Sequence, residues 1–325
     1  AHKGVIFQKN SICNISDSYI SKRLMVVADS IQFTQQQYPF SAIVRATRKY
    51  YGMTQGGFAR AMGYKQNMLS EVENEINTPT IDFWARFCEV TGVEEESARV
   101  GFLNFKNRPH VPVLEPVSTP IEGFKIPEQY ADARGTSINA LRYVFLYLKQ
   151  KMGFKGLERF LASLGVDPDY FLILDHQISH KFWADMIDKA IALGIFGIQD
   201  LEQILTPIAK PWAHQVVKAR FDQCESAMDL LKTRINTVKQ TYECNYRYNV
   251  VEEKRETGFL DFEVVAEPHV QHLLDTGDHA RFMVEYRRVY FELFANRYCV
   301  GLPTKVNVVR DGKTRWIYRT QINQN

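Results

Sequence analysis

The sequence predicts a multidomain protein in which an all-α domain is followed by an α+β domain with antiparallel strands. Three observations support this prediction. Residues 54–73 read as two short helices joined by a glycine turn. Residues 105–127 hold five of the twelve prolines, which forbids a helix there and favours a semi-rigid linker that can hold two domains apart while limiting their relative position. Beyond this linker the apolar residues have helical spacing as far as about residue 238, and then the period of two that is typical of strands.

The composition indicates a globular protein that keeps its thiols reduced. A chain of 325 residues usually forms two domains or more, and 45% apolar with 24% charged residues is typical of folded proteins. No apolar run approaches the ~20 residues that span a membrane. The start, AHKGVIFQKNSICNIS, lacks the apolar core of a secretory signal. The five cysteines are scattered and odd in number, which fits reduced thiols in a cytoplasm. Together with the lack of a long apolar run, this predicts a cytoplasmic protein with no membrane partner.

Residues 54–73, TQGGFARAMGYKQNMLSEVE, carry the most informative motif. Thr54 can cap the first helix, and Gly63 stands where the chain must turn sharply with a positive φ. Leu69 and Val72 follow at a spacing that places both on the inner face of the second helix. These features define a helix-turn-helix, whose second helix enters the major groove of DNA.

The residues on either side strengthen this interpretation. Residues 45–93, RATRKYYGMTQGGFARAMGYKQNMLSEVENEINTPTIDFWARFCEVTGV, resemble the Xre family of helix-turn-helix domains, the family of the Cro and phage-repressor proteins. The resemblance runs through all of the helices expected of the family. We therefore delimit this domain as residues 39–104 and treat residues 1–38 as an N-terminal extension. The alternative is a helical hairpin that only packs, or a domain kept for protein contacts.

The resemblance implies a set of DNA-binding residues. Gln55, which opens the first helix of the motif, would hydrogen-bond a phosphate, and Asn74 would hold the next phosphate beyond the second helix. On the outer face of the second helix, Gln and Asn can pair with adenine, and Glu can accept a hydrogen bond from cytosine. The residues assigned to this face or to its leading turn are Lys65, Gln66, Asn67, Ser70 and Glu71. The expected partner is double-stranded operator DNA.

Some positions are structural, and some depart from the family. The resemblance places Arg48 and Glu73 as a buried ion pair between two helices. Lys65 replaces the Ser or Thr that usually caps the recognition helix, and the loss of that cap costs on the order of 1 kcal/mol. Glu71 puts a negative charge where Arg is frequent, which leaves the operator sequence open.

The modest charge predicts that two copies act together. The net charge of the whole chain is only +3, so one domain alone should bind DNA weakly. Two such domains bound to a two-fold operator would compensate for the weak binding of one. We therefore expect a homodimer with its contact mainly in residues 128–325. An apolar stripe along a predicted helix near 212–238 either forms this contact or packs within its own domain.

Residues 128–325 are predicted to form helices first and then a mixture of strands and helices. Ser137 and Ser179 are expected helix caps, and Gly153 is expected to end the first of these helices. Asp311 and Gly312 signal a hairpin turn near the end of the chain. The predicted helices are 137–152, 156–164, 180–193, 200–209, a stretch after Pro211 to about 238, and 280–298. The predicted strands lie at 242–250, around Phe262 and Val264, and on both sides of the hairpin turn.

This order of elements is similar to that of bacterial small-molecule sensor domains. It resembles vinyl-reductase-type and heme–nitric-oxide-binding-like folds. The segment LERFLASLGVDPDYFLILDHQISHKFWADMIDKAIALG also resembles the ligand domain of some AraC-type regulators. The resemblance implies a small-molecule effector. The resemblance does not decide whether the domain has a heme pocket. It singles out no histidine as an axial ligand, and no cofactor is predicted.

The aromatic side chains of the strands are the candidate ligand pocket. Such residues more often form core, but Tyr and Trp present apolar faces with polar tips, which suits a small, partly apolar molecule. The candidate residues are Tyr242, Tyr246, Tyr248, Phe262, Trp316 and Tyr318.

Signals for catalysis or metal binding are weak. His176 and His180 have the spacing of two zinc ligands on one helix, but Ser179 reads as a helix cap, which places His176 in the preceding loop. No P-loop, GxSxG or Rossmann fingerprint occurs. We therefore predict no metal, no catalytic residues and no enzyme.

These observations predict a cytoplasmic, bacterial-type transcription regulator. Its C-terminal domain would sense a small, partly apolar molecule, would dimerise, or would do both. The alternative is a DNA-anchored interaction protein whose C-terminal domain docks a protein partner. An enzyme fused to a DNA-binding domain is the third interpretation. The ligand, the operator sequence and the direction of regulation are left open by the sequence.

Overall fold

The computed structural model describes residues 39–105, 123–131, 135–209, 221, 223–224, 226–241, 244–275, 277–298 and 304–322. The described residues belong to one compact unit, residues 38–325. The predicted N-terminal extension, residues 1–38, lies outside the described residues. Within the described part of the chain, no helix combines the length and the apolar character needed to cross a membrane.

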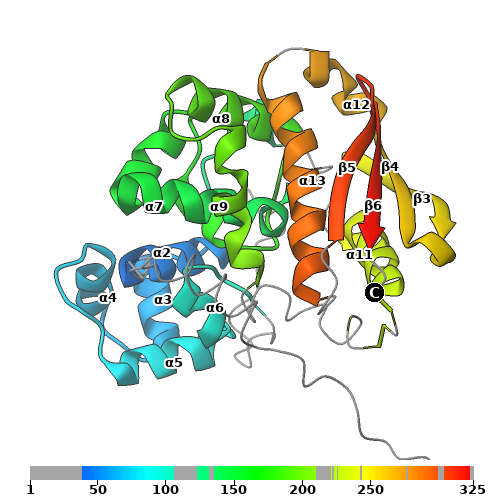
Figure 1. The fold of residues 1–325 in the computed structure, drawn as a ribbon. Helices are drawn as coiled ribbons and strands as arrows, with labels where there is room; N and C mark the ends of the chain where they lie inside the picture. Colours follow the sequence, from blue (N-terminus) through cyan, green and yellow to red (C-terminus); the bar gives the residue numbers. More distant parts are fainter. Residues whose placement is uncertain are drawn as a thin grey trace, which may run out of the picture. The chain divides into compact units, whose positions relative to one another are not determined.

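The N-terminal part is all-α, as predicted (Figure 1). Thr54 caps the first helix of the motif by accepting a hydrogen bond from the Gly57 N–H, and Gly63 ends that helix with φ +80°. Phe58, Leu69 and Val72 are fully buried between the helices. The helices are α2 (Phe40–Tyr50), α3 (Gln55–Met62), α4 (Gln66–Glu73), α5 (Ile81–Thr91) and α6 (Glu95–Val100).

The helices of the remaining chain begin and end largely where the caps predict. Ser137 and Ser179 both accept a hydrogen bond from a backbone N–H in the first turn of the following helix. Gly153, with φ +72°, interrupts α7 and separates its two helical halves. The α-helices are α7 (Ile138–Ala162), α8 (His180–Ala192), α9 (Leu201–Leu205), α11 (Ala227–Thr241), α12 (Pro268–Gln271) and α13 (His279–Tyr298). The 3-10 helices are η1 (Glu128–Tyr130), η2 (Pro168–Leu172), η3 (Ile198–Asp200), η4 (Thr206–Ala209), η6 (Arg255–Thr257) and η7 (His272–Asp275).

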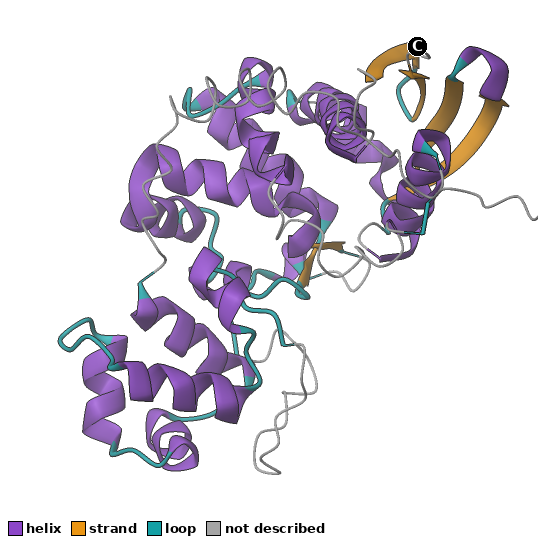
Figure 2. Cartoon of the chain, turned by 60° about the horizontal axis from the view of Figure 1, so that its bottom comes forward, coloured by secondary structure: helices purple, strands orange, loops and turns teal. Residues whose placement is uncertain are grey.

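The strands in the described part of the chain form two antiparallel sheets, which confirms the predicted α+β class. A small sheet pairs β1 (Thr136–Ser137) with β2 (Gln177–Ile178). The larger sheet has the order β3-β4-β6-β5 and lies to one side of the helices in Figure 2. Its strands are β3 (Tyr246–Lys254), β4 (Phe259–Ala266), β5 (Thr304–Asp311) and β6 (Arg315–Ile322).

The strand predicted at 242–250 differs from β3 at both ends. Within the described residues β3 begins at Tyr246, and it extends beyond Val250 to Lys254. Cys244 and Val250, which the alternating pattern placed inward, are exposed. The pairing of β3 with β4 shifts register between Val250 and Glu252, so the strict alternation does not continue into the second half of β3.

Helix α13 packs on one face of the larger sheet. Phe262 of β4 meets Phe291 of α13 with ring centroids 4.7 Å apart, and the Tyr318 hydroxyl of β6 donates to the Val284 carbonyl at 3.1 Å. The opposite face carries cross-strand ion pairs such as Asp261–Arg319, at 2.7 Å. The sheet therefore has one buried face and one polar face, as is usual for antiparallel sheets.

The apolar stripe that was one candidate for a dimer contact packs inside its own domain. Met228, Leu231 and Ile235 of α11 are 5%, 0% and 0% exposed in the single chain. The stripe's first members, Val216, Val217 and Ala219, lie outside the described residues. The members of the stripe that the structure describes are therefore used inside the single chain, and they are not available for a contact between two copies.

The N-terminal helices and the C-terminal domain are in direct contact. Leu103 pairs with Ile173 through two backbone hydrogen bonds, from the Leu103 N–H to the Leu172 carbonyl at 2.6 Å and from the Leu174 N–H to the Leu103 carbonyl at 3.1 Å. Most of the predicted linker, residues 106–122, lies outside the described residues. The described residues on either side of this segment are nevertheless in contact, whereas a linker of this composition can also hold two domains apart.

Candidate nucleic-acid interface

Helix α4 has a buried face and an outward polar face. Leu69 and Val72 are 1% and 2% exposed, whereas Lys65, Gln66 and Asn67 at its start are all exposed. Lys65 is the N-cap residue and makes no capping hydrogen bond with its side chain, as its departure from the family pattern predicts. The amides of Gln66 and Asn67 are therefore accessible to a base edge, while the rest of the helix is anchored in the core.

The other end of α4 is held by local hydrogen bonds. The Asn74 amide donates to the Ser70 carbonyl at 2.8 Å and to the Ser70 hydroxyl at 3.2 Å. The Asn77 amide donates to the Glu71 carboxylate at 2.5 Å. Ser70, Glu71 and Asn74 would therefore have to exchange part of these bonds before they contact DNA, unlike Gln66 and Asn67.

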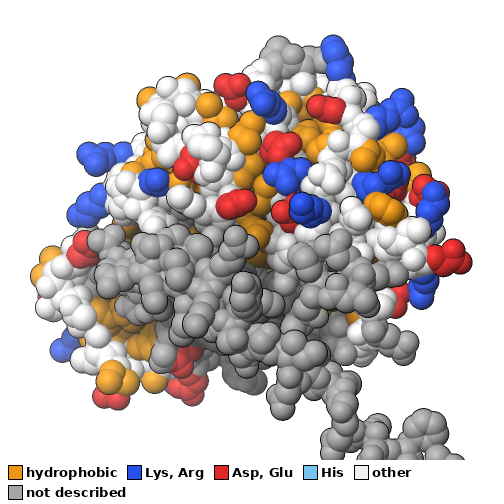
Figure 3. Space-filling view, viewed as in Figure 1, with side chains coloured by type: hydrophobic (Ala, Val, Ile, Leu, Met, Phe, Trp, Pro, Cys, Tyr) orange, Lys and Arg blue, Asp and Glu red, His pale blue; other side chains and the backbone are white. Residues whose placement is uncertain are grey.

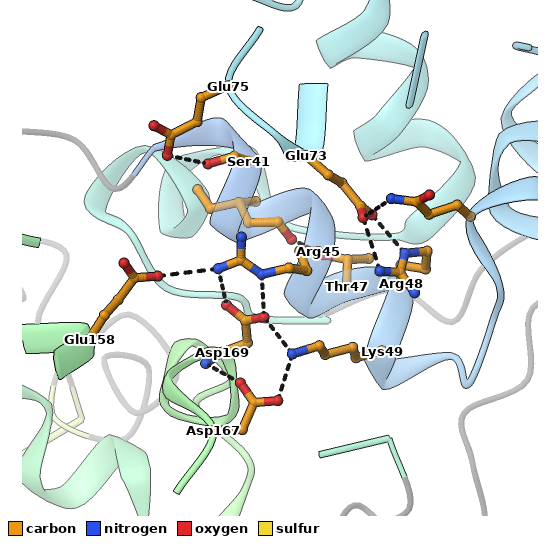
Figure 4. Close-up of polar contacts among 12 residues, drawn as sticks. Ser41, Arg45, Thr47, Arg48, Lys49, Glu73, Glu75, Glu158, Asp167 and Asp169 are labelled. Atoms are coloured by element: carbon orange, nitrogen blue, oxygen red, sulfur yellow. Dashed lines mark hydrogen bonds and ion pairs between the residues drawn. The ribbon is translucent and has the colours of Figure 1, made fainter. Parts of the chain in front are cut away.

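Arg48, Glu73 and Gln55 form one polar cluster. The Arg48 guanidinium makes two hydrogen bonds to the Glu73 carboxylate, at 2.6 and 2.9 Å, and the Gln55 amide donates to the same carboxylate at 2.8 Å (Figure 4). The Glu73 side chain is 4% exposed. The predicted Arg48–Glu73 pair is therefore present. A contact of the Gln55 side chain with phosphate, which was predicted from its position, requires its bond to Glu73 to be exchanged.

A second cluster, which the sequence did not reveal, joins α2 to the C-terminal domain. We call these five residues the inter-domain clamp: Arg45, Lys49, Glu158, Asp167 and Asp169. Arg45 binds Asp169 at 2.6 and 2.8 Å and Glu158 at 3.3 Å, while Lys49 binds Asp167 at 2.5 Å and Asp169 at 2.8 Å (Figure 4). The Asp169 side chain is only 2% exposed. The spacing Asp-Pro-Asp at 167–169 is the only local signal in the sequence, and it does not identify a partner 120 residues away.

The electrostatics of the clamp favour the paired state. Burial tends to lower the pKa of Arg45, but the hydrogen bond and the charge of Asp169 outweigh this and hold the pKa above its ordinary value. Burial raises the pKa of Glu158, and the charge of Arg45 opposes that shift. Because Asp169 accepts from two cations, removing both would leave a buried carboxylate without compensation.

The candidate ligand-pocket residues lie together on the buried face of the larger sheet. Tyr246, Tyr248, Phe262, Trp316 and Tyr318 are 0–4% exposed, and Tyr242 lies outside the described residues. A residue that the sequence did not single out, Arg287 of α13, lies among them. Its guanidinium carbon is 3.8 Å from the ring centroid of Tyr246, and its Nε donates to the Tyr248 hydroxyl at 3.1 Å. Tyr246, Tyr248 and Trp316 thus lie against a buried guanidinium and provide it with both apolar and polar contacts.

The two histidines considered as zinc ligands are buried in different surroundings. His176 lies in the loop before α8 with its Nδ1 3.1 Å from the Tyr170 carbonyl, and burial lowers its pKa to about 3. The Nε2 of His180 is 3.0 Å from the Tyr246 hydroxyl. Burial is the main cause that lowers the pKa of His180 to about 3, and the positive charge of Arg287 is the second. Among the described residues no group of three or more His, Cys, Asp or Glu side chains could hold a metal ion.

Comparison with known proteins supports the assignment of the N-terminal part. Residues 44–97 match a family model described as helix-turn-helix. This part of the chain is therefore a helix-turn-helix domain of the Xre type, as the sequence predicts. No curated protein matches the chain significantly.

The C-terminal region resembles H-NOX domains in structure. One is an oxygen-binding H-NOX domain related to soluble guanylate cyclases, with a TM-score of 0.42 and 12% identity over 58% of this chain and 95% of that chain. Another is a Cs H-NOX mutant that carries 4-cyano-phenylalanine, with a TM-score of 0.41 and 11% identity over 58% of this chain and 97% of that chain.

Proposed function

We propose that this chain is a cytoplasmic transcription regulator that binds operator DNA through its helix-turn-helix domain. The observation that carries the proposal is the anchored helix α4, which turns the exposed amides of Gln66 and Asn67 outward beside a matched helix-turn-helix framework. Amide side chains in this position can pair bidentately with adenine, which is the direct readout expected of a recognition helix. This architecture is typically not enzymatic.

The test is selection of binding sites from random duplex DNA, followed by fluorescence anisotropy on the enriched duplex. The proposal requires one preferred site that the chain binds at least a hundredfold more tightly than unrelated duplex at the same salt concentration. Equal affinity for every duplex would refute specific regulation at an operator.

We propose further that the C-terminal domain senses a small, partly apolar molecule at the cluster of Tyr246, Tyr248, Trp316, Tyr318 and Arg287. The aromatic faces and the guanidinium carry this assignment, because together they suit a ligand with both an apolar body and a polar group. Native mass spectrometry of the purified chain tests it by detecting a retained molecule, and an absorption spectrum of the same sample tests for heme. Loss of the retained molecule in Trp316→Ala, with the chain still folded, is the expected result.

The chain is also expected to act as a homodimer, because one near-neutral domain binds DNA weakly. Light scattering over a dilution series tests this directly. A monomer at tens of micromolar would instead favour the second candidate, a DNA-anchored protein whose C-terminal domain docks a protein partner.

A further inference from the structure

The first helix of the DNA-binding domain has its cations engaged elsewhere. Arg45 and Lys49 of α2 are held by the carboxylates of the inter-domain clamp. Arg48, the third cation of this helix, is held by Glu73. Helix α2 therefore offers DNA no cation that is not already in an ion pair, and contacts to phosphate must come from other residues.

The outward side of α3 and α4 is close to neutral. Its exposed cations are Arg60 and Lys65, and the acidic residues Glu71 and Glu75 lie on or directly after α4. Contacts between cations and phosphates supply most of the nonspecific affinity of a DNA-binding protein and a large share of its specific affinity. The helix-turn-helix domain alone is therefore short of the charge that duplex binding needs.

The second half of α7 brings cations to the end of the recognition helix. Glu75 follows α4 by two residues, and its carboxylate lies 3.9 Å from the Lys155 ammonium and 3.0 Å from the Ser41 hydroxyl. Lys155 keeps 78% of its side chain exposed, so this pair is loose and the ammonium is accessible. A helix of the C-terminal domain therefore reaches the loop that immediately follows α4.

Helical spacing extends this basic surface. Arg159 is exposed and follows Lys155 by one helical turn, so both lie on the same side of the second half of α7. Glu158, between them, turns toward α2 and binds Arg45. Lys and Arg side chains gather along the α7 edge on the left of Figure 3. The clamp therefore fixes this half of α7 with its acidic residue inward and its two cations outward.

We infer that Lys155 and Arg159 are part of the DNA-binding surface and contact phosphates of the duplex that flank the bases read by α4. The partner is the backbone of double-stranded DNA, so these contacts are independent of base sequence. The inference rests on the proposed function and deepens it, because it makes the C-terminal domain a direct partner of DNA. The clamp then positions two separate contact surfaces on one duplex.

The experiment measures affinity against salt concentration for the full chain and for Lys155→Ala/Arg159→Ala on the selected duplex and on an unrelated duplex. Each lost phosphate contact lowers the magnitude of the slope of log K against log[salt] by ~0.9, so we expect a decrease of about 1.8. At low salt the affinity should fall by a similar factor on both duplexes. The matched control removes the same charge from strand β5, Lys305→Ala/Arg310→Ala, two exposed cations of the sheet, and should keep the slope of the unaltered chain.

Two further variants test whether the charge at these two positions determines the slope. The exchange Lys155→Arg/Arg159→Lys conserves charge and should restore the slope, whereas Lys155→Glu/Arg159→Glu should weaken binding beyond the alanine variant. Circular dichroism and the melting temperature confirm that each variant is folded. If the unaltered chain binds duplex DNA but the alanine variant keeps its slope, the inference is wrong and the proposed function stands. If the unaltered chain binds no duplex at all, both are wrong.

Discussion

At the residue scale, Glu73 shows how one side chain organises the DNA-binding domain. Its carboxylate accepts hydrogen bonds from Arg48 and from Gln55 while only 4% of its side chain is exposed. The sequence predicts the Arg48–Glu73 pair because both residues occupy family positions. It does not predict the role of Gln55 in the same cluster, because an amide at a helix start is equally placed for phosphate until the neighbouring side chains are known.

Breaking this pair from one side should destabilise the domain. We expect Arg48→Ala to lower the free energy of unfolding by roughly 3 kcal/mol, because Glu73 would remain buried as an uncompensated charge. Urea denaturation followed by circular dichroism measures the change. Arg48→Met/Glu73→Leu should cost less than Arg48→Ala, because it removes both charges. A neutral Arg48→Ala would show that the pair contributes nothing to stability.

Gln66 should determine specificity, whereas Gln55 should affect all sequences. Gln66→Ala is expected to lose roughly 1–3 kcal/mol at the preferred site and little on unrelated duplex, because a bidentate contact to adenine is lost. Gln55→Ala should weaken binding to both duplexes alike. Its amide contacts either a phosphate or the Glu73 carboxylate, and neither contact depends on the base sequence. Anisotropy titrations on the two duplexes decide this. A uniform loss with Gln66→Ala would remove Gln66 from base readout.

At the scale of elements, helices and caps could be predicted better than strand limits. Ser137 and Ser179 are caps that act within a few residues, so the local sequence is sufficient to predict them. The start of β3 and its register shift after Val250 depend on pairing with β4, which is a tertiary property. The period of two correctly predicted that Tyr246 and Tyr248 face inward. It wrongly predicted the same of Val250, which lies at the register shift.

The start of α8 should make the fold sensitive to acid. His176 and His180 have pKa values lowered to about 3 by burial, so the folded state keeps them neutral while the unfolded chain binds protons below about pH 6.5. Their contribution to stability is complete above pH 6.5 and is lost as the pH falls toward the folded-state pKa. Within this window, each histidine should lower the free energy of unfolding by up to ~1.4 kcal/mol for every unit by which the pH falls.

Urea midpoints between pH 7.5 and pH 4.5 measure this dependence. His176→Gln should remove about half of the part of the decline that His176 and His180 cause, because one of these two histidines with a lowered pKa no longer titrates. His272→Gln, at an exposed position, is the matched control for the substitution itself. A midpoint that does not move with pH in the unaltered chain would contradict the neutral, buried state of both histidines.

At the scale of the whole molecule, the clamp joins the two domains by direct ion pairs. Asp169 is 2% exposed and binds both Arg45 and Lys49, and the backbone pairing of Leu103 with Ile173 lies in the same boundary. The sequence predicts both domains but not this junction, because the proline-rich segment between them favours separation and the clamp partners lie more than 100 residues apart. A ligand-dependent change in the C-terminal domain would therefore be transmitted to α2 by direct contact.

Removing the clamp cations should uncouple the domains. We expect Arg45→Ala/Lys49→Ala to cost on the order of 3 kcal/mol, because Asp169 keeps its burial and loses both opposite charges. Calorimetry should then show an earlier transition for the helix-turn-helix domain in place of one cooperative transition. Adding Asp169→Asn should recover part of the lost stability, because it neutralises the buried carboxylate that no longer has a cation beside it.

Arg86→Ala is the control. Its ion pair with Glu89 has side chains that are 43% and 68% exposed, so the substitution should cost less than about 1 kcal/mol. If the clamp variant and the control melt alike, the boundary is held by apolar packing and backbone pairing, and the clamp does not couple the domains.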